Sequence, residues 1–155
     1  MGVSVSASTA VIVAGMFFAF TAFYPVAANG FERVTEGERD LHEGAIERQN
    51  TAVTVESATF NASGNDELVV NATNEGTVGL VVSDASLVVD NEYVDVAADE
   101  SWTSVDGTGD TDLWLDGETL SIAIPDAAVD ADLANASRVV VVTESGVRDA
   151  AEVSA

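Results

Sequence analysis

One uncharged run governs the architecture of this chain: Ala10-Val-Ile-Val-Ala-Gly-Met-Phe-Phe-Ala-Phe-Thr-Ala-Phe-Tyr-Pro-Val-Ala-Ala28. Only Thr21 and Tyr24 interrupt its apolar character. At a helical rise of about 1.5 Å per residue, a helix of this length covers about 28 Å, close to the hydrocarbon thickness of a bilayer. The first charged side chain is Glu32, so all 27 carboxylates follow the run. We therefore predict an N-terminal tail and transmembrane helix over residues 1–30, and a polar remainder.

The charge of the remainder is extreme, because 27 acidic residues face only five basic ones and the formal net charge is −22. All five basic residues are arginines, and the chain has no lysine and no cysteine. Such a surface repels itself unless salt screens it, and at molar ionic strength the Debye length falls to about 3 Å. We therefore predict an acidic protein of a halophilic archaeon. The 47% of hydrophobic residues favours a folded domain over disorder, and the lack of a basic patch argues against nucleic-acid binding.

The apolar run is interpreted as a retained anchor and not as a secretory signal. A signal peptide has a basic leader and a short apolar core, whereas residues 2–9 contain no lysine or arginine and the run is longer than a usual signal core. The alternative is cleavage at Ala27-Ala28-Asn29, which has the small-residue pattern of a cleavage site. We expect the chain to keep its N-terminus and to span the membrane once.

Two features disagree about which side of the membrane the large domain occupies. Under the positive-inside rule, the arginines that follow the span would hold the domain in the cytoplasm; they are Arg33, Arg39 and Arg48. Three N-glycosylation sequons favour the outside, because such triplets mark surface positions in exported chains; they begin at Asn61, Asn71 and Asn135. Long domains translocate largely regardless of charge, so we predict an extracellular domain between the cell membrane and the outer envelope.

The chain after the span divides by hydrophobic period. Residues 31–50 carry apolar side chains at helical spacing and predict a stalk helix that continues out of the membrane. From Thr51 the period changes to two, and turn pairs such as Asp90-Asn91 separate short β-rich runs. The expected strands cover residues 51–60, 67–73, 77–83, 86–89, 92–96, 111–115, 119–124, 138–143 and 147–153. Strands at this spacing predict a mainly β chain with an immunoglobulin-like β-sandwich over residues 51–155.

One of these runs, Val139-Val-Val-Val142, has no polar alternation. Strands that are covered on both faces read as continuous apolar runs. We therefore predict that this strand is central in its sheet and buried on both faces.

No catalytic, cofactor-binding or metal-binding residue is predicted. The chain has no cysteine and no lysine, and its single histidine, His42, lies in the charged stalk, so the usual pairs of nucleophile and base are missing. The loop Asp106-Gly-Thr-Gly-Asp-Thr-Asp112 has the acidic spacing of a calcium loop but lacks the glycine at its sixth position and the glutamate at its twelfth. A flexible acidic loop is the expectation, and a weak cation site is the alternative. Trp102 and Trp114 are expected in the core or in hairpins, with Trp114 facing away from both leucine neighbours.

Four runs of the sequence resemble one family. They are Gly2-Val-Ser-Val-Ser-Ala-Ser-Thr-Ala10, Asn71-Ala-Thr-Asn-Glu-Gly76, Asp112-Leu-Trp-Leu-Asp-Gly-Glu-Thr-Leu120 and Arg138-Val-Val-Val-Val-Thr-Glu-Ser-Gly146. They look like the haloarchaeal archaellum accessory family FlaF, also called ArlF, and the resemblance covers nearly the whole chain. The sister family FlaG (ArlG) has the same plan of anchor and sandwich.

The resemblance implies a non-enzymatic stator of the archaellum, the motor with which archaea swim. Members of the family carry one N-terminal span and an external immunoglobulin-like domain that binds the S-layer glycoprotein, often as a homodimer, and they act with FlaG in the archaellum motor complex. We expect the docking surface on exposed strand edges, because edges offer unpaired backbone groups. The alternative is a pilin-like or archaellin-like filament subunit. Such subunits need a basic leader before the apolar run. Residues 2–9 contain no lysine or arginine, so we expect a stator and not a filament subunit.

Overall fold

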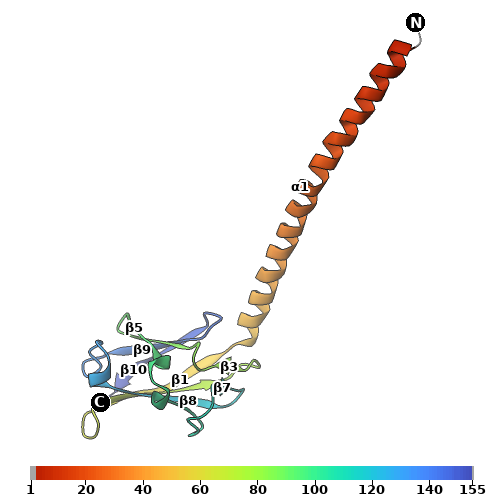
Figure 1. Cartoon of the computed structure of the whole chain (residues 1–155). Coiled ribbons are helices and arrows are strands. Elements are labelled where there is room, and N and C mark those ends of the chain that lie inside the picture. The colour runs from red at the N-terminus through yellow and green to blue at the C-terminus, as the bar shows by residue number, and fades with distance from the viewer. Residues whose placement is uncertain (1–2, 155) are drawn as a thin grey trace. The chain divides into compact units, whose positions relative to one another are not determined.

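The computed structural model describes residues 3–154, with side chains from residue 7 onward. Figure 1 shows a long helix, α1 (Val3–Asn50), followed by a β domain. The chain divides into two compact units, one that ends at Glu43 and one that begins at Gly44, so the last turns of α1 belong to the unit that holds the β domain. The remaining elements are β1 (Val53–Asn61), β2 (Glu67–Asn74), β3 (Leu80–Val81), β4 (Ser86–Val89), β5 (Glu92–Val94), η1 (Val96–Ala98), η2 (Glu100–Trp102), β6 (Thr103–Val105), β7 (Leu113–Trp114), β8 (Thr119–Pro125), η3 (Asp126–Ala128), β9 (Arg138–Val142) and β10 (Arg148–Ser154).

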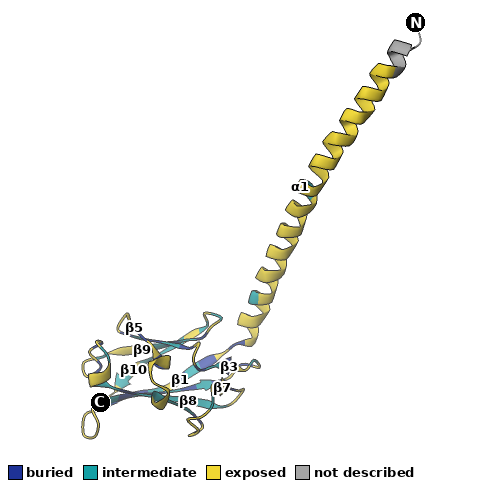
Figure 2. Ribbon diagram, viewed as in Figure 1, coloured by how far each residue is buried: buried dark blue, intermediate teal, exposed yellow. Residues whose placement is uncertain are grey.

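Helix α1 contains the predicted span and the predicted stalk in one element. It is long and apolar enough to cross a membrane by length and composition. It runs through Pro25 without ending, and helices that cross membranes tolerate the loss of one backbone hydrogen bond at a proline. Its large apolar side chains lie open, with Phe17, Phe18 and Phe31 each at least 68% exposed (Figure 2). The exposed apolar surface over residues 10–28 is long enough to match the hydrocarbon core of a bilayer.

The β domain consists of two antiparallel layers that share β10. One layer has the order β6-β8-β2-β1, and the other has the order β5-β4-β9-β10. β10 pairs antiparallel with β9 over residues 148–152 and then parallel with β1, where Val153 lies opposite Ala58. This order is that of the ABED and CFG sheets of an immunoglobulin domain, with one added edge strand. The predicted mainly β fold with an N-terminal helix is confirmed.

One hydrophobic core lies between the two layers. Strands of both layers alternate buried and open residues, and the buried ones form a single cluster. Its largest fully buried side chains are Trp114, Leu68, Leu87, Leu120, Ile122, Ile124, Leu133, Val70, Val96, Val139 and Val141. Figure 2 shows the same contrast between the covered interior of the sandwich and the open helix.

Tight turns form where the sequence predicts them. Asp90 and Asn91 join β4 to β5 with φ angles of 45° and 74°. Asp106 and Gly107 follow β6 with φ angles of 47° and 80°. Two successive residues with positive φ form the turn that best suits the twist of a hairpin, and Asp, Asn and Gly adopt this conformation most readily.

The prediction that residues 139–142 are buried on both faces is wrong. β9 lies centrally between β4 and β10, as expected, but only Val139 and Val141 are fully buried. Val140 and Val142 are half-buried. The run lacks polar residues because its outer face also carries valines, and not because a second layer covers it among the described residues.

Several strand boundaries also differ from the prediction. β5 and β7 are shorter than the expected ranges 92–96 and 111–115. The strand expected over residues 77–83 shrinks to β3, because the N–H of Thr77 donates to the carbonyl of Asn50 and the carbonyl of Val78 accepts from Asn74. Those two bonds hold the first residues of the run away from any ladder. The sequence analysis also missed β6, which pairs with β8 but is only three residues long and has a single valine.

Candidate functional site

The end of α1 is joined to the sandwich by backbone hydrogen bonds. The carbonyl oxygen of Asn50, the last helical residue, accepts from the N–H of Thr77 at 2.9 Å. The carbonyl oxygen of Ala52 accepts from the N–H groups of Glu75 and Gly76 at 2.8 and 3.0 Å. The bond to Asn50 satisfies one of the carbonyl groups that a helix end leaves unpaired. We call the contacts among residues 47–52, residues 74–77 and Ser145 the helix–sandwich junction.

Two side chains strengthen this junction. The Nε of Arg48 donates to the carbonyl oxygen of Ser145, in the turn between β9 and β10, at 2.9 Å. Arg48 lies in the last turn of α1, where a positive charge also interacts favourably with the helix dipole. Thr51 is only 5% exposed, and its hydroxyl donates to the carbonyl oxygen of Glu47 at 2.9 Å.

Gly76 allows the two segments of the junction to approach closely. A Cβ atom at this position would lie 2.5 Å from the carbonyl oxygen of Asn50 and 2.7 Å from the nitrogen of Ala52. Both neighbours are backbone atoms, which cannot move aside as a flexible side chain can. The junction therefore requires glycine at this position for lack of space.

A buried polar network supports the junction from the core side. Asn74 is fully buried; its Nδ2 donates to the carbonyl oxygens of Val78 and Trp114 at 2.9 and 3.1 Å, and its Oδ1 accepts from the N–H of Gly76 at 3.0 Å. Trp114 is also fully buried, and its Nε1 donates to the carbonyl oxygen of Glu118 at 2.7 Å. Because these buried polar groups are hydrogen-bonded, the network holds its residues in one arrangement without an unsatisfied group.

Three of the four runs that carry the family resemblance meet at this place. Residues 71–76 and 112–120 supply the network around Asn74 and Trp114, and residues 138–146 supply Ser145. The sequence alone does not indicate that Asn74-Glu-Gly76 contacts the end of the helix. The predicted orientation of Trp114 is confirmed, because Trp114 is buried while Leu113 and Leu115 are 50% and 45% exposed.

The outer face of the second layer is the other candidate feature. Strand register places Tyr93 opposite Val88, Val88 opposite Val140 and Val140 opposite Ala150, so these four side chains form one row across the layer. The row points away from the core, because Val139 and Val141 on either side of Val140 are buried. We call this surface the arginine face; its residues are Tyr93, Val88, Val140, Val142, Ala150, Arg138 and Arg148.

Charge distinguishes the arginine face from the rest of the molecule. Arg138 and Arg148 are two of only five basic residues in a chain of net charge −22, and both are exposed. Together with the valines they line a shallow depression of about 370 Å³. Two acidic residues lie beside it: Glu152 is opposite Arg138 in the register, and Asp149 lines the depression while its Oδ2 accepts from the N–H of Val55 at 2.8 Å. A surface that combines half-open valines with two arginines is suited to an acidic partner.

Two short strands lie at the ends of the eight-stranded order. They are β5 and β6, and each has three residues. β1 and β10 pair with each other only through Ala58–Val153 and Thr59–Ser154 among the described residues. Short edge strands expose few unpaired backbone groups, which limits pairing with another chain.

Asp90 fixes the backbone at one end of the arginine face. Its Oδ2 accepts from the N–H of Ser137 at 2.9 Å, and its Oδ1 accepts from the hydroxyl of Ser137 at 2.7 Å and from the N–H of Arg138 at 3.0 Å. The backbone and hydroxyl bonds from Ser137, with a smaller effect of Arg138, lower the pKa of Asp90 because they stabilise its charged form.

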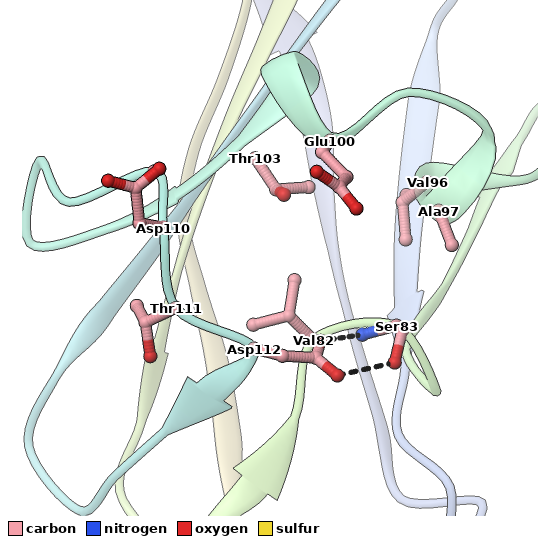
Figure 3. Close-up of a pocket in the computed structure, with 10 residues that line it drawn as sticks. Val82, Ser83, Val96, Ala97, Glu100, Thr103, Asp110, Thr111 and Asp112 are labelled. Atoms are coloured by element: carbon pink, nitrogen blue, oxygen red, sulfur yellow. Dashed lines mark hydrogen bonds between the residues drawn. The ribbon is translucent and has the colours of Figure 1, made fainter.

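Two carboxylates of the acidic loop over residues 106–112 accept hydrogen bonds from other residues of the domain. The Oδ1 of Asp106 accepts from the N–H of Thr119 at 3.1 Å, and the carboxylate of Asp112 accepts from the N–H and the hydroxyl of Ser83, both at 2.8 Å. Figure 3 shows the adjoining pocket of about 380 Å³, where Asp110 and Glu100 lie on separate segments. Among residues 3–154, no group of three acidic or histidine side chains is placed to hold a metal ion.

The other residues singled out from the sequence lie apart from one another. His42 is exposed on α1. Trp102 ends η2 and is partly buried against the core. Of the three sequon asparagines, Asn61 ends β1, Asn71 lies within β2 and Asn135 lies in the connection before β9.

Comparisons with known proteins find similar solved structures, of which two are described here. No family model matches the chain, and no curated protein matches it. One structure is the archaellum periplasmic stator protein FlaG from Sulfolobus acidocaldarius, with 17% identity, a TM-score of 0.41 and coverage of 65% of this chain and 97% of that one. The other is the archaellum periplasmic stator protein complex of FlaF and FlaG from the same organism, with 17% identity, a TM-score of 0.40 and coverage of 64% and 85%. Likeness at this level carries no argument about function.

Proposed function

We propose that this chain is a non-enzymatic stator component of the archaellum motor, which anchors the motor to the cell envelope by binding the S-layer. A rotating filament needs a fixed point against which torque can act. A helix held in the bilayer and continued into a stalk and a rigid sandwich provides such a point without any chemistry. The resemblance of four sequence runs to the FlaF family supports this proposal. It implies FlaG as the partner in the motor complex and the S-layer glycoprotein as the external ligand.

The helix–sandwich junction is the observation that carries the proposal. Only Thr51 and Ala52 separate the end of α1 from the start of β1, so there is no loop that could stretch under force. The backbone bonds of Asn50 and Ala52 and the bond from Arg48 to Ser145 hold the last helical turn on the domain. A connection of this kind transmits force between the helix end and the sandwich. A binding or catalytic domain that was merely tethered to a membrane would not need it.

We assign binding of the S-layer to the arginine face. Among the described residues it is the surface where two arginines lie beside a row of half-open apolar side chains, in a chain of net charge −22. In molar salt, long-range attraction is screened, so close contacts of the valines and short ion pairs of Arg138 and Arg148 supply the affinity.

The proposed location is the cell membrane, crossed once by α1, with the sandwich between the membrane and the S-layer. The helix has the length and composition for one crossing. The three sequons support an external domain. The arginines that follow the span lie among acidic residues in an exposed helix, where they are a weak signal for retention.

The test is affinity capture of the full-length, tagged chain from cross-linked native membranes in molar salt. We expect the S-layer glycoprotein and FlaG among the recovered proteins. In the double variant Arg138→Glu/Arg148→Glu, recovery of the S-layer glycoprotein should fall about tenfold, which corresponds to about 1.4 kcal/mol. The matched control is Arg33→Glu/Arg39→Glu on α1, which should leave that recovery unchanged. Recovery of neither protein, or enrichment of the chain in purified filaments, would contradict the stator role; the second result would favour a pilin-like or archaellin-like subunit.

A further inference from the structure

The three sequons lie in three different structural settings. A sequon accepts a glycan when its asparagine and hydroxyl residue can enter the active site of a transferase as an accessible segment. In a folded domain, that requires an exposed asparagine amide and a backbone that is not held by two neighbouring strands. The hydrogen bonds of the sandwich separate the three sites by these criteria.

The sequon at Asn61 is accessible. Asn61 is the exposed last residue of β1, and it pairs with Glu67 of β2 on one side. Among the described residues no strand pairs with its other side, because Thr59 is the last residue of β1 that pairs with β10. The turn that follows contains the exposed Ser63. Among the described residues, neither the amide of Asn61 nor the hydroxyl of Ser63 has a hydrogen-bond partner. A Cβ atom on Gly64 would lie 3.1 Å from the Nδ2 of Asn61, so the glycine leaves room beside the amide.

The sequon at Asn71 is held in the sheet. Asn71 lies inside β2, between Ser57 of β1 and Ser121 of β8, and its Nδ2 donates to the hydroxyl of Ser57 at 3.0 Å. The hydroxyl of Thr73 donates to Glu56 at 2.8 Å. A transferase would have to separate β2 from both neighbouring strands to bind this segment.

The sequon at Asn135 is exposed, but both of its reacting groups are engaged. The Nδ2 of Asn135 donates to both carboxylate oxygens of Asp132, at 3.0 and 2.9 Å. The hydroxyl and the N–H of Ser137 donate to Asp90 at 2.7 and 2.9 Å. Hydrogen bonds to a carboxylate are about twice as strong as those between neutral groups, so two carboxylates hold this sequon in place.

We propose that Asn61 is a site of N-linked glycosylation and that Asn71 and Asn135 are not. The glycan donor is a lipid-linked oligosaccharide phosphate outside the membrane, and the catalyst is a membrane-bound oligosaccharyltransferase. The Nδ2 of Asn61 forms a bond to the anomeric carbon of the first sugar while the bond from that carbon to the phosphate oxygen breaks. The lipid phosphate leaves with the electron pair, and the amide proton passes to a base of the transferase. This inference rests on the external location in the proposed function.

The test is peptide mass spectrometry of the full-length chain purified from its native membranes. We expect a glycan on the peptide that contains Asn61 and none on the peptides that contain Asn71 or Asn135. Asn61→Gln and Ser63→Ala should each remove the glycan mass, whereas the matched control Asn135→Gln should keep it. An unmodified Asn61, or a glycan on either of the other two asparagines, would overturn the inference.

A second measurement separates this failure from a failure of the proposed location. The chain has no cysteine, so Glu144→Cys introduces a single thiol in the exposed turn after β9. A maleimide that cannot cross membranes should label this thiol on intact cells. Labelling together with an unmodified Asn61 overturns the glycosylation site and leaves the location standing. A thiol that reacts only after lysis overturns the external location and the glycosylation site together.

Discussion

At the scale of the residue, Gly76 and Asn74 do most to join the helix to the sandwich. Asn74 is a buried polar residue whose side-chain amide forms hydrogen bonds with the backbone of Val78, Trp114 and Gly76. Gly76 lies where a side chain would meet the end of α1. The resemblance of residues 71–76 to the FlaF family therefore falls on a place where few other residues fit.

Gly76→Ala should destabilise the domain by about 1–3 kcal/mol, the usual cost of forcing an extra carbon into a packed site. The reason is the 2.5 Å approach of its Cβ atom to the carbonyl oxygen of Asn50. The measurement is denaturant unfolding of the full-length chain in detergent and molar salt. Gly109→Ala is the matched control, because its Cβ atom would meet only the carbonyl oxygen of Thr103 at 3.8 Å. If both variants unfold at the same denaturant concentration, the close packing at the junction is not as described.

Asp90 should make the stability of the domain depend on pH in the acidic range. Hydrogen bonds from Ser137 and Arg138 lower the pKa of Asp90 in the folded state, so the unfolded chain binds more protons as the pH falls. The contribution is complete above the ordinary aspartate value of about 3.9 and is lost as the pH falls through the lower folded value. Asp90→Asn should therefore make the unfolding temperature fall less steeply as the pH is lowered through this range. The measurement is thermal unfolding at a series of pH values. The exposed Asp84→Asn is the control, and an equally shallow fall in both variants would contradict the role of Asp90.

Local rules predicted single residues well wherever the cause is local. The turn at Asp90-Asn91 and the inward orientation of Trp114 follow from positive φ and from the alternation of a strand. The role of Asn74 could not be predicted in this way. Its hydrogen-bond partner Trp114 is 40 residues away in the sequence. The hydrophobic periodicity of a sequence does not predict which distant carbonyl group accepts a hydrogen bond from an asparagine.

At the scale of the element, the hydrophobic period located most strands but not their lengths. β2 and β8 fall close to their expected ranges because each alternates apolar and polar residues over several positions. β4 covers its expected range as a short run rich in valine. β3 is shorter than expected because Thr77 and Val78 form hydrogen bonds with Asn50 and Asn74 instead of with a neighbouring strand. β6 was missed because three residues give too little pattern.

The continuity of α1 should matter for force transmission. A flexible insert of six glycine and serine residues after Glu43 would break the helix ahead of the junction, since glycine costs about 1 kcal/mol per residue in a helix. We expect loss of swimming in cells that carry this insert, with normal membrane levels of the chain. An insert of six alanine, glutamate and lysine residues has the same length and keeps the helix, so it should retain far more motility. Equal swimming with both inserts would argue against transmission through α1.

At the scale of the whole molecule, the charge predicts a dependence on salt. With a net charge of −22, self-repulsion grows as the Debye length rises from about 3 Å at 1 M to about 10 Å at 0.1 M salt. The β domain of the full-length chain should lose thermal stability over this range, as measured by circular dichroism in a nonionic detergent. A sucrose series at constant salt serves as the control for general stabilisation. An unfolding temperature that stays the same at both salt concentrations would contradict the prediction of a halophilic protein.

The arginine face is also a property of the whole molecule. Val88, Val140 and Ala150 come from three strands and lie in one row only through the register of the second layer. The sequence indicated a sandwich, but strand order and register depend on long-range pairing that alternation alone does not specify. For that reason the sequence alone does not indicate that these side chains form one surface.

We propose that the chain holds a fixed position between the membrane and the S-layer. Single-molecule tracking of the tagged full-length chain in living cells tests it directly. We expect immobile molecules at the cell surface that begin to diffuse when the S-layer is removed, and a larger mobile fraction for Arg138→Glu/Arg148→Glu than for Arg33→Glu/Arg39→Glu. Free diffusion in cells with an intact S-layer, or rotation of the chain with the filament, would contradict a stator.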